Sequence, residues 1–280
     1  MDIRYSANQR DFKRYTTEEI RSEFLIEKLF AANEMAAVYS HVDRMVTLGC
    51  MPTTEAVPID KGIDCWKNFG TTYFLERREI GIFNIGGSGN IDVDGTVYKL
   101  GFEDCLYIAM GTKKVVFRSD DAATPAKFYM VSAPAHKTCK TTFISIHDAN
   151  KCPCGTAESS NARTINQFIH PDVLETCQLS MGLTCLEPGN VWNTIPAHTH
   201  ERRMEVYMYF NIPEGNVVFH MMGEGSQTRH IVMQNEQAVI SPSWSIHAGC
   251  GTSNYTFIWA MGGENKAFDD MDNIANTDLR

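Results

Sequence analysis

Long apolar runs are absent from this sequence. No stretch of about 18 apolar residues occurs in its 280 residues, so a membrane-spanning helix is not expected. The opening residues, MDIRYSANQRDFKRY, are polar and charged and lack the apolar segment of a secretory signal. We therefore expect a cytoplasmic protein with no membrane partner.

Basic residues are also in deficit. The chain has 25 Lys and Arg against 34 Asp and Glu, which gives a formal net charge of −9 at pH 7. Nucleic-acid binding requires a basic face, so this balance argues against a nucleic-acid partner. Hydrophobic residues make up 43% of the chain, which is typical of a globular protein with one large or two small domains.

Cysteines show no paired pattern. Their number is odd, nine, and most lie singly within apolar runs, as Cys105 and Cys185 do, which is typical of reduced, buried thiols. The exception is Cys152-Pro-Cys154. A C-x-C pair can bind a metal, but neither a second cysteine pair nor a nearby histidine cluster completes a zinc site. The role of this pair is left open.

Helical patterns are few. Residues 16–32 form the clearest one, because Thr16 and Glu19 have capping-box spacing and apolar residues follow with helical periodicity. From about residue 70 onward, short runs rich in Val, Ile, Phe and Tyr alternate with turn residues, and Asp94-Gly95 indicates a hairpin. The sequence therefore predicts an all-β fold with an N-terminal helix and few short helices.

Two β-rich halves flank residues 150–163, which are polar, contain Gly, Pro and Ser, and indicate a linker or long loop. The halves present similar features in a similar order: LGFEDCLYIAMGT in the first resembles QNEQAVISPSWS in the second. We expect two copies of one β-barrel, over residues 1–150 with the helix and over residues 151–280.

The segment PAHTHERRMEVYMYF carries the candidate chemistry. Alternate side chains of a strand face the same way, so His198 and His200 point to one side, roughly 7 Å apart. A turn through residues 201–203 would place Glu205 at the start of the next antiparallel strand, beside both histidines. His247, which follows a proline turn, is the candidate for a further ligand. Three histidines and a glutamate together predict a metal site.

These residues match the pattern G-x-n-H-x-H-x4-E followed by P-x4-H-x6-N, which is similar to the two signature motifs of the cupin superfamily. The matching residues are Gly189, His198, His200, Glu205, Gly215, Pro242, His247 and Asn254. The gap between Gly189 and His198 is longer than the commonest spacing. The resemblance implies a bicupin of two jelly-roll-like barrels. The first half has no H-x-H, so its barrel would be degenerate and metal-free.

A closer resemblance rests on ETCQLSMGLTCLEPGNVWNTIPAHTHERRMEVYMYF, with SPSWSIHAG and WAMGGEN further on. These segments are similar to the 5-keto-4-deoxyuronate isomerases, the ketol-isomerases of pectin degradation. That family converts 5-dehydro-4-deoxy-D-glucuronate to 3-deoxy-D-glycero-2,5-hexodiulosonate. The resemblance implies a zinc ion on His198, His200, Glu205 and His247, a small-molecule uronate substrate, and a cytoplasmic homohexamer.

A ketol-isomerase needs an electrophile that polarises the carbonyl and a base that moves one proton. Glu205 is the candidate for metal ligand, for base, or for both. The substrate's carboxylate needs a cation, for which Arg163, Arg202 and Arg203 are candidates, although the adjacent pair also suits surface ion pairs. Tyr207 shares a strand face with Glu205, so it either contacts the substrate, where it could donate a proton, or packs in the core.

Two other functions remain open at this point. Three histidines and a glutamate suit Fe(II), manganese or nickel almost as well as zinc, which would fit a cupin dioxygenase. A non-catalytic sugar-binding or regulatory cupin is the second alternative, and the metal motif argues against it.

Overall fold

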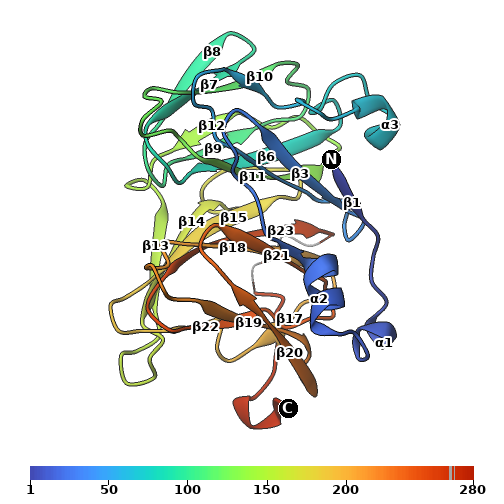
Figure 1. The fold of residues 1–280 in the computed structure, drawn as a ribbon, viewed down its shortest axis with the longest axis vertical. Coiled ribbons are helices and arrows are strands. Elements are labelled where there is room, and N and C mark those ends of the chain that lie inside the picture. The colour runs from blue at the N-terminus through green and yellow to red at the C-terminus, as the bar shows by residue number, and fades with distance from the viewer. Residues whose placement is uncertain (265–266, 268) are drawn as a thin grey trace. The chain divides into compact units, whose positions relative to one another are not determined.

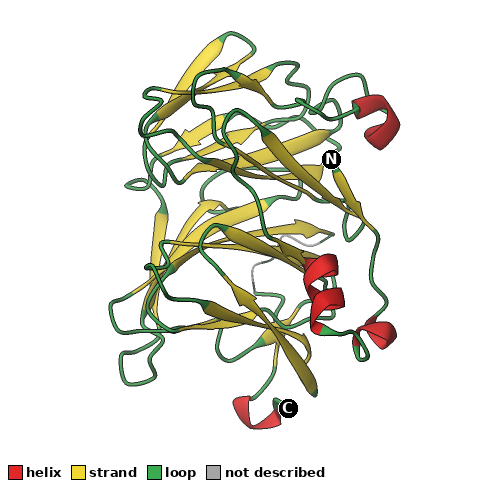
Figure 2. Cartoon of the chain, in the orientation of Figure 1, coloured by secondary structure: helices red, strands yellow, loops and turns green. Residues whose placement is uncertain are grey.

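The computed structural model describes residues 1–264, 267 and 269–280, and strands dominate this part of the chain (Figure 1, Figure 2). The chain divides into two compact units. The first unit comprises Met1–Arg4, Lys28–Ala149 and Phe168–Ser180, and the second comprises Tyr5–Glu27, Asn150–Gln167 and Met181–Arg280. Among the described residues, no helix is long and apolar enough to cross a membrane.

The first unit pairs a large and a small sheet. Within its described residues, the large sheet has the order β1 (Asp2–Arg4), β3 (Met35–Ser40), β4 (Val46–Cys50), β11 (Phe128–Pro134), β6 (Arg78–Asn84), β9 (Cys105–Ile108) and β12 (Thr142–Ile144). The small sheet has the order β5 (Val57–Pro58), β10 (Val115–Ser119), β7 (Gly89–Val93) and β8 (Thr96–Leu100). Buried apolar side chains of both sheets, such as Ile82, Met130, Ile91 and Phe117, form one core.

The second unit repeats this plan. Its large sheet has the order β13 (Asn150–Cys154), β14 (Arg163–Ile169), β15 (Ser180–Leu186), β23 (Thr256–Gly263), β18 (Arg203–Phe210), β21 (Gln237–Ser241) and β2 (Leu25–Ile26). Its small sheet has the order β16 (Trp192–Asn193), β22 (Ala248–Gly251), β19 (Val218–Glu224) and β20 (Gln227–Met233). A further pair joins β17 (His198–Thr199) to β24 (Asp272–Asn273).

The two units share one strand order. In the large sheets, β4-β11-β6-β9 corresponds to β15-β23-β18-β21, and the small sheets match in the same way. β6 and β18 both begin with an arginine opposite the last residue of their neighbouring strand. Ile80, the third residue of β6, therefore stands where β18 has Glu205. Ile80 is fully buried in the apolar core of the first unit, so this equivalent position carries no metal donor.

The helices are short. They are α1 (Gln9–Phe12), α2 (Thr17–Phe24), α3 (Cys65–Phe69) and a 3-10 turn (Asn276–Asp278). The predicted capping box is confirmed, because Thr16 Oγ1 accepts from Glu19 N and Glu19 Oε2 accepts from Thr16 N. The predicted helix end at residue 32 is wrong. Leu25 and Ile26 are extended instead and pair with β21 at the sheet edge, which satisfies their backbone groups and buries both side chains.

The predicted hairpin at Asp94-Gly95 is confirmed between β7 and β8. Both turn residues have positive φ, 48° and 90°, the combination that a tight two-residue hairpin turn requires. The predicted linker over residues 150–163 is wrong for its first part. Residues 150–154 form β13, whose central Pro153 is tolerated because β13 is an edge strand. Cys152 and Cys154 are free, partly exposed thiols on this strand.

The division into units also differs from the predicted single boundary at residue 150. The segment Tyr5–Glu27 belongs to the second unit, where Phe12, Ile20 and Phe24 are buried in its core. The segment Phe168–Ser180 belongs to the first unit. The carboxylate of Glu79, on β6, holds this segment: it accepts hydrogen bonds of 2.7 Å from the backbone N–H groups of Cys177, Gln178 and Leu179.

Candidate metal centre

A tight turn brings the three residues of the central motif together. His198 lies in β17, His200 follows it, and the chain turns at residues 201–202 before β18 begins at Arg203. Glu205 is the third residue of β18 and lines a pocket of the second unit. His247 directly precedes β22. The predicted turn and the predicted position of Glu205 at the start of the next strand agree with this arrangement.

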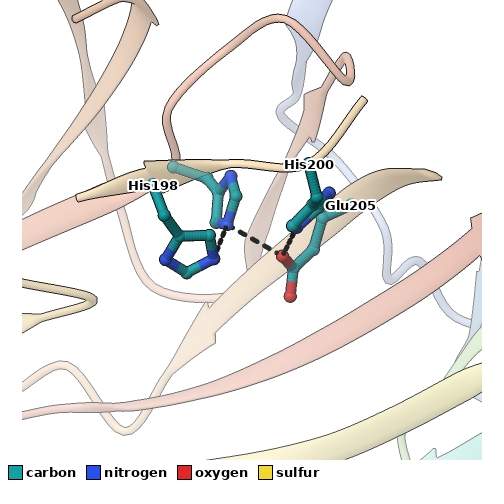
Figure 3. A group of neighbouring side chains, drawn as sticks. His198, His200 and Glu205 are labelled. Carbon is teal, nitrogen blue, oxygen red and sulfur yellow. Dashed lines mark hydrogen bonds and ion pairs between the residues drawn. The ribbon is translucent and has the colours of Figure 1, made fainter. Parts of the chain in front are cut away.

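The four donor side chains converge. Glu205 Oε2 lies 3.2 Å from His200 Nε2 and 3.0 Å from His247 Nε2, and His247 Nε2 lies 3.0 Å from His198 Nε2. Figure 3 shows His198, His200 and Glu205 directed toward a common point. All four donor atoms lie within 4.8 Å of one another, the only such group found among the described residues. This spacing suits one ion bound by all four residues.

Backbone carbonyls orient two of the imidazoles. His200 Nδ1 lies 2.9 Å from the carbonyl oxygen of Arg203, and His247 Nδ1 lies 3.4 Å from that of Ser245. A carbonyl only accepts, so each Nδ1 carries the hydrogen and each Nε2 directs its lone pair into the centre. Three imidazole nitrogens and one carboxylate oxygen form a donor set that suits zinc and other divalent first-row metals. The residues present therefore fit a bound metal ion.

The pKa shifts of His198 and Glu205 also favour the binding of a cation. Burial and the neighbouring His247 lower the pKa of His198 to about 3, although Glu205 opposes the shift. Burial acts to raise the pKa of Glu205, but His247 and His200 outweigh it and hold that pKa well below its usual range. Glu205 is therefore ionised at neutral pH in the metal-free protein, which suits a metal ligand that binds through Oε2.

His200 behaves differently. Burial alone would lower its pKa, but the hydrogen bond and the charge of Glu205 outweigh burial and raise the pKa above 6.5. In the metal-free protein a proton therefore occupies His200 below that raised pKa, and a metal ion must displace it.

This predicts that metal affinity is insensitive to pH above the pKa of His200 and falls about tenfold per pH unit below it. Calorimetric titration of the metal-free protein in two buffers of different ionisation enthalpy measures the protons released. His198, with its low pKa, contributes none of them between pH 5 and 8. A metal affinity that stayed constant down to about pH 5 would contradict the assignment of His200 as a ligand.

A cavity of about 250 Å³ opens beside the centre. Polar residues line it together with a wall of aromatic and apolar residues: Arg163, Ile165, Thr184, Thr194, Ile195, Pro196, His198, Arg203, Glu205, Tyr207, Phe257, Trp259, Met261, Met271 and Asn273. The Trp259 ring packs directly over Gly182, where a Cβ would lie 2.1 Å from the indole. Gly182 therefore allows the indole to form this wall.

The three candidate arginines differ in whether they line the cavity and in the residues that they contact. Arg163 and Arg203 line the cavity, whereas the side chain of Arg202 is 66% exposed, pairs with Glu264 and lies outside the cavity lining. Arg203 is buried and forms an ion pair of 2.6 Å with Asp270. Arg163 Nη1 donates to the backbone oxygen of Asn161 and has no ion pair among the residues that the structure describes. Arg163 is therefore the lining arginine whose charge is available to a bound anion.

Tyr207 lines the cavity with its hydroxyl 2.9 Å from Thr194 Oγ1. Burial, together with the Glu205 charge, raises the pKa of Tyr207 well above its usual value, so the phenol keeps its proton. The predicted shared face of Glu205 and Tyr207 agrees with the alternation along β18, and both side chains are buried, as is that of Tyr209. Tyr209 lies deeper, hydrogen-bonded to His220 at 2.8 Å.

Several residues beside the site carry no local sequence motif and were not predicted. Thr194, Asp270 and Asn273 come from segments with no local motif, and each reaches the site only through the tertiary fold. His220 carried a sequence signal, an inward position on an alternating strand, but it hydrogen-bonds Tyr209 rather than joining the metal donors.

Comparison with known proteins identifies the family of this chain. A protein-family model described as the KduI/IolB family matches residues 29–276. The chain belongs to this family. Proteins named 4-deoxy-L-threo-5-hexosulose-uronate ketol-isomerase from Escherichia coli and from Shigella sonnei are each 57% identical to it over 280 residues, covering 100% of both chains.

Solved structures share the fold at low identity. An IolB-like protein from Salmonella typhimurium has a TM-score of 0.67 at 13% identity, covering 82% of this chain and 87% of that one. An oxalate decarboxylase from Lactobacillus farciminis has a TM-score of 0.55 at 10% identity, covering 83% and 79%. The predicted all-β, cupin-like fold of the KduI/IolB chain is confirmed, and its paired sheets are compatible with two jelly-roll-like barrels.

Proposed function

We infer that this chain is a 4-deoxy-L-threo-5-hexosulose-uronate ketol-isomerase. It converts that open-chain uronate to 3-deoxy-D-glycero-2,5-hexodiulosonate by moving a carbonyl from C1 to C2. The full-length identity of 57% to proteins of that name carries this conclusion. The four-donor centre beside a cavity with an available arginine is compatible with the reaction.

Each end of the substrate has a matching group in the cavity. A divalent ion on the four donors would act as a Lewis acid toward the C1 aldehyde. Arg163 would hold the carboxylate at the other end through two parallel hydrogen bonds, since no ion pair among the described residues already engages its guanidinium. The apolar wall of Phe257, Trp259 and Met261 would exclude water from the carbon chain between them.

Tyr207 and Glu205 are the residues that we propose for proton transfer and for the hydrogen bond that assists it. Tyr207 Oη holds its proton and can donate a hydrogen bond to a substrate oxygen on which negative charge develops. Both histidine contacts of the Glu205 carboxylate are made through Oε2, and in Figure 3 the dashed lines from two imidazoles meet at that one oxygen. Oε1 is therefore the oxygen we propose for the proton that leaves C2 and returns at C1, while the proton of the C2 hydroxyl passes to the C1 oxygen.

Zinc is the ion that we propose, because its tetrahedral preference suits three imidazoles and one carboxylate and because isomerisation needs no redox change. We also propose a cytoplasmic homohexamer, on the basis of the resemblance to the isomerase family. Light scattering coupled to size-exclusion chromatography measures the assembly directly, and a stable monomer would contradict the hexamer.

The deciding experiment for the function is elemental analysis beside an anaerobic isomerase assay on the uronate. About one zinc per chain with oxygen-independent turnover supports the isomerase and its centre together. Iron with turnover only in air would keep the donor set but move the function to an oxygenase.

Replacement of Arg163 by Met tests the carboxylate assignment. Loss of a charge-assisted pair of hydrogen bonds should lower kcat/KM about 30-fold, mostly through a higher KM, with metal content unchanged. Arg202→Met is the matched control, because that side chain is largely exposed and lies outside the cavity lining, and it should stay within about twofold of wild type. Equal kinetic losses in the two variants would contradict the role of Arg163.

A further inference from the structure

The segment Asp270–Asn273 forms part of the site wall. Met271 and Asn273 line the cavity beside the metal centre. β24 pairs with β17 in the register His198↔Asn273 and Thr199↔Asp272, so this segment is hydrogen-bonded to the strand that carries a metal ligand. Because the pairing involves backbone groups, it fixes the segment independently of its side chains.

Residues 274–280, which directly follow this segment, make further contacts with the second unit. Ile274 N donates to Ala197 O at 2.8 Å, and Arg280 bonds through its backbone to Gly225 and Thr228. Ile274 and Leu279 pack against a small buried cluster of Ala197, Ile246 and Ala248. His247, a metal donor, lies between the last two of these residues in the chain. The chain after the segment is therefore anchored to residues that neighbour His198 and His247 in the sequence.

Asp270, at the start of this segment, forms an ion pair with Arg203. Its Oδ1 lies 2.6 Å from Arg203 Nη2, and the Arg203 side chain is only 2% exposed. On the other side, Arg203 Nη1 lies 2.7 Å from Met261 Sδ, which cannot balance its charge. A buried guanidinium without a carboxylate partner is unfavourable, and a divalent cation in the same pocket would make it more so.

Arg203 connects directly to the metal centre. Its carbonyl oxygen accepts the hydrogen bond from His200 Nδ1 that directs His200 Nε2 inward, and it lies two residues before Glu205 on β18. A displacement of Arg203 would therefore disturb the orientation of one donor and the start of the strand that carries another.

We propose that Asp270 is a positioning residue of the metal centre, which neutralises and fixes the buried Arg203 so that the four donors can bind a divalent cation beside it. In this assignment Asp270 acts on the donors through Arg203. The inference rests on the proposed function only in taking the four-donor group as a metal site, because metal binding can be measured without substrate.

The test is a double-variant cycle read by Zn²⁺ affinity, measured on the full chain by competition with a chromophoric chelator. Asp270→Asn should weaken Zn²⁺ binding about tenfold, since it removes a negative charge that lies 2.6 Å from the buried Arg203 guanidinium beside the ion. In the Arg203→Met background the same Asp270→Asn change should alter the affinity by less than about twofold. Asp272→Asn, an exposed neighbour that pairs only through its backbone, is the matched control and should leave affinity unchanged.

Non-additivity of Asp270→Asn and Arg203→Met supports the proposal. Asp270→Glu keeps the negative charge and is the substitute if Asp270→Asn proves unstable. A Zn²⁺ affinity of Asp270→Glu within about threefold of wild type also supports the proposal. Equal losses from Asp270→Asn in both backgrounds, or no loss where Arg203 is present, overturn it. Zinc binding by wild type without isomerase turnover would reject the proposed function while leaving this test intact.

Discussion

His198→Ala should abolish metal binding and isomerase activity while the fold persists. The variant removes one of four converging donors and leaves a site of two imidazoles and one carboxylate. We expect the zinc affinity to fall on the order of 100-fold or more, and turnover to fall at least as far because the carbonyl loses its electrophile. Elemental analysis after dialysis, an isomerase assay and circular dichroism together measure this outcome.

The folded state should tolerate this change. His198 is only partly buried, and β17 pairs with β24 through backbone groups that alanine retains. His230→Ala is the matched control, because His230 is an exposed histidine on β20, away from the donor group, and should keep full zinc content. Near-normal activity of His198→Ala would reject the metal centre, and unfolding of this variant would show that the centre is also structural.

Glu79→Ala should strongly destabilise the folded protein. The carboxylate is fully buried and accepts three backbone N–H bonds of 2.7 Å and one O–H bond of 2.6 Å from Tyr107. Alanine removes this acceptor from all four donors, of which the N–H groups of Cys177 and Leu179 lie in buried residues. Since each unpaired buried donor costs roughly 1–3 kcal/mol, we expect a loss of at least about 4 kcal/mol in the free energy of unfolding.

Urea unfolding followed by tryptophan fluorescence measures this change. Tyr107→Phe removes a single donor to the same carboxylate and should lower the free energy of unfolding by only about 1 kcal/mol. This variant therefore measures the effect of losing one of these hydrogen bonds. A Glu79→Ala protein that unfolds at the wild-type urea midpoint would show that another interaction holds residues 177–179 in the first unit.

Local patterns predicted the parts of this protein that depend on near neighbours in the chain. The capping box of Thr16 and Glu19 and the hairpin at Asp94-Gly95 are each complete within four residues, so their backbone geometry follows from the residues themselves. His198, His200 and Glu205 converge for a related reason, since strand alternation and one short turn suffice to align them. His247 was a candidate from its position after a proline turn and then from the family motif, because nothing local connects it to the other three.

Other predictions failed where distant partners decide the structure. The apolar run after Phe24 has helical periodicity, but β21 offers Leu25 and Ile26 an edge to pair with, so the helix ends early. Residues 150–154 have the composition of a loop, yet pairing with β14 makes them a strand. Composition could not separate Arg202 from Arg203, because Arg202 lies in the turn and Arg203 begins β18, and only the packed fold shows which of the two side chains faces the cavity.

By itself the sequence determined the all-β class, the repeated halves and the four candidate metal donors, because periodicity, turn chemistry and donor spacing are properties of short segments. The tertiary structure alone decided that Asp270 pairs with the distant Arg203, that Glu79 holds residues 177–179, and that Arg163 faces the cavity without an ion pair among the described residues. Each of these depends on which segments pack together. Burial then decides the outcome, since a charge removed from water must find its partner wherever the fold places one.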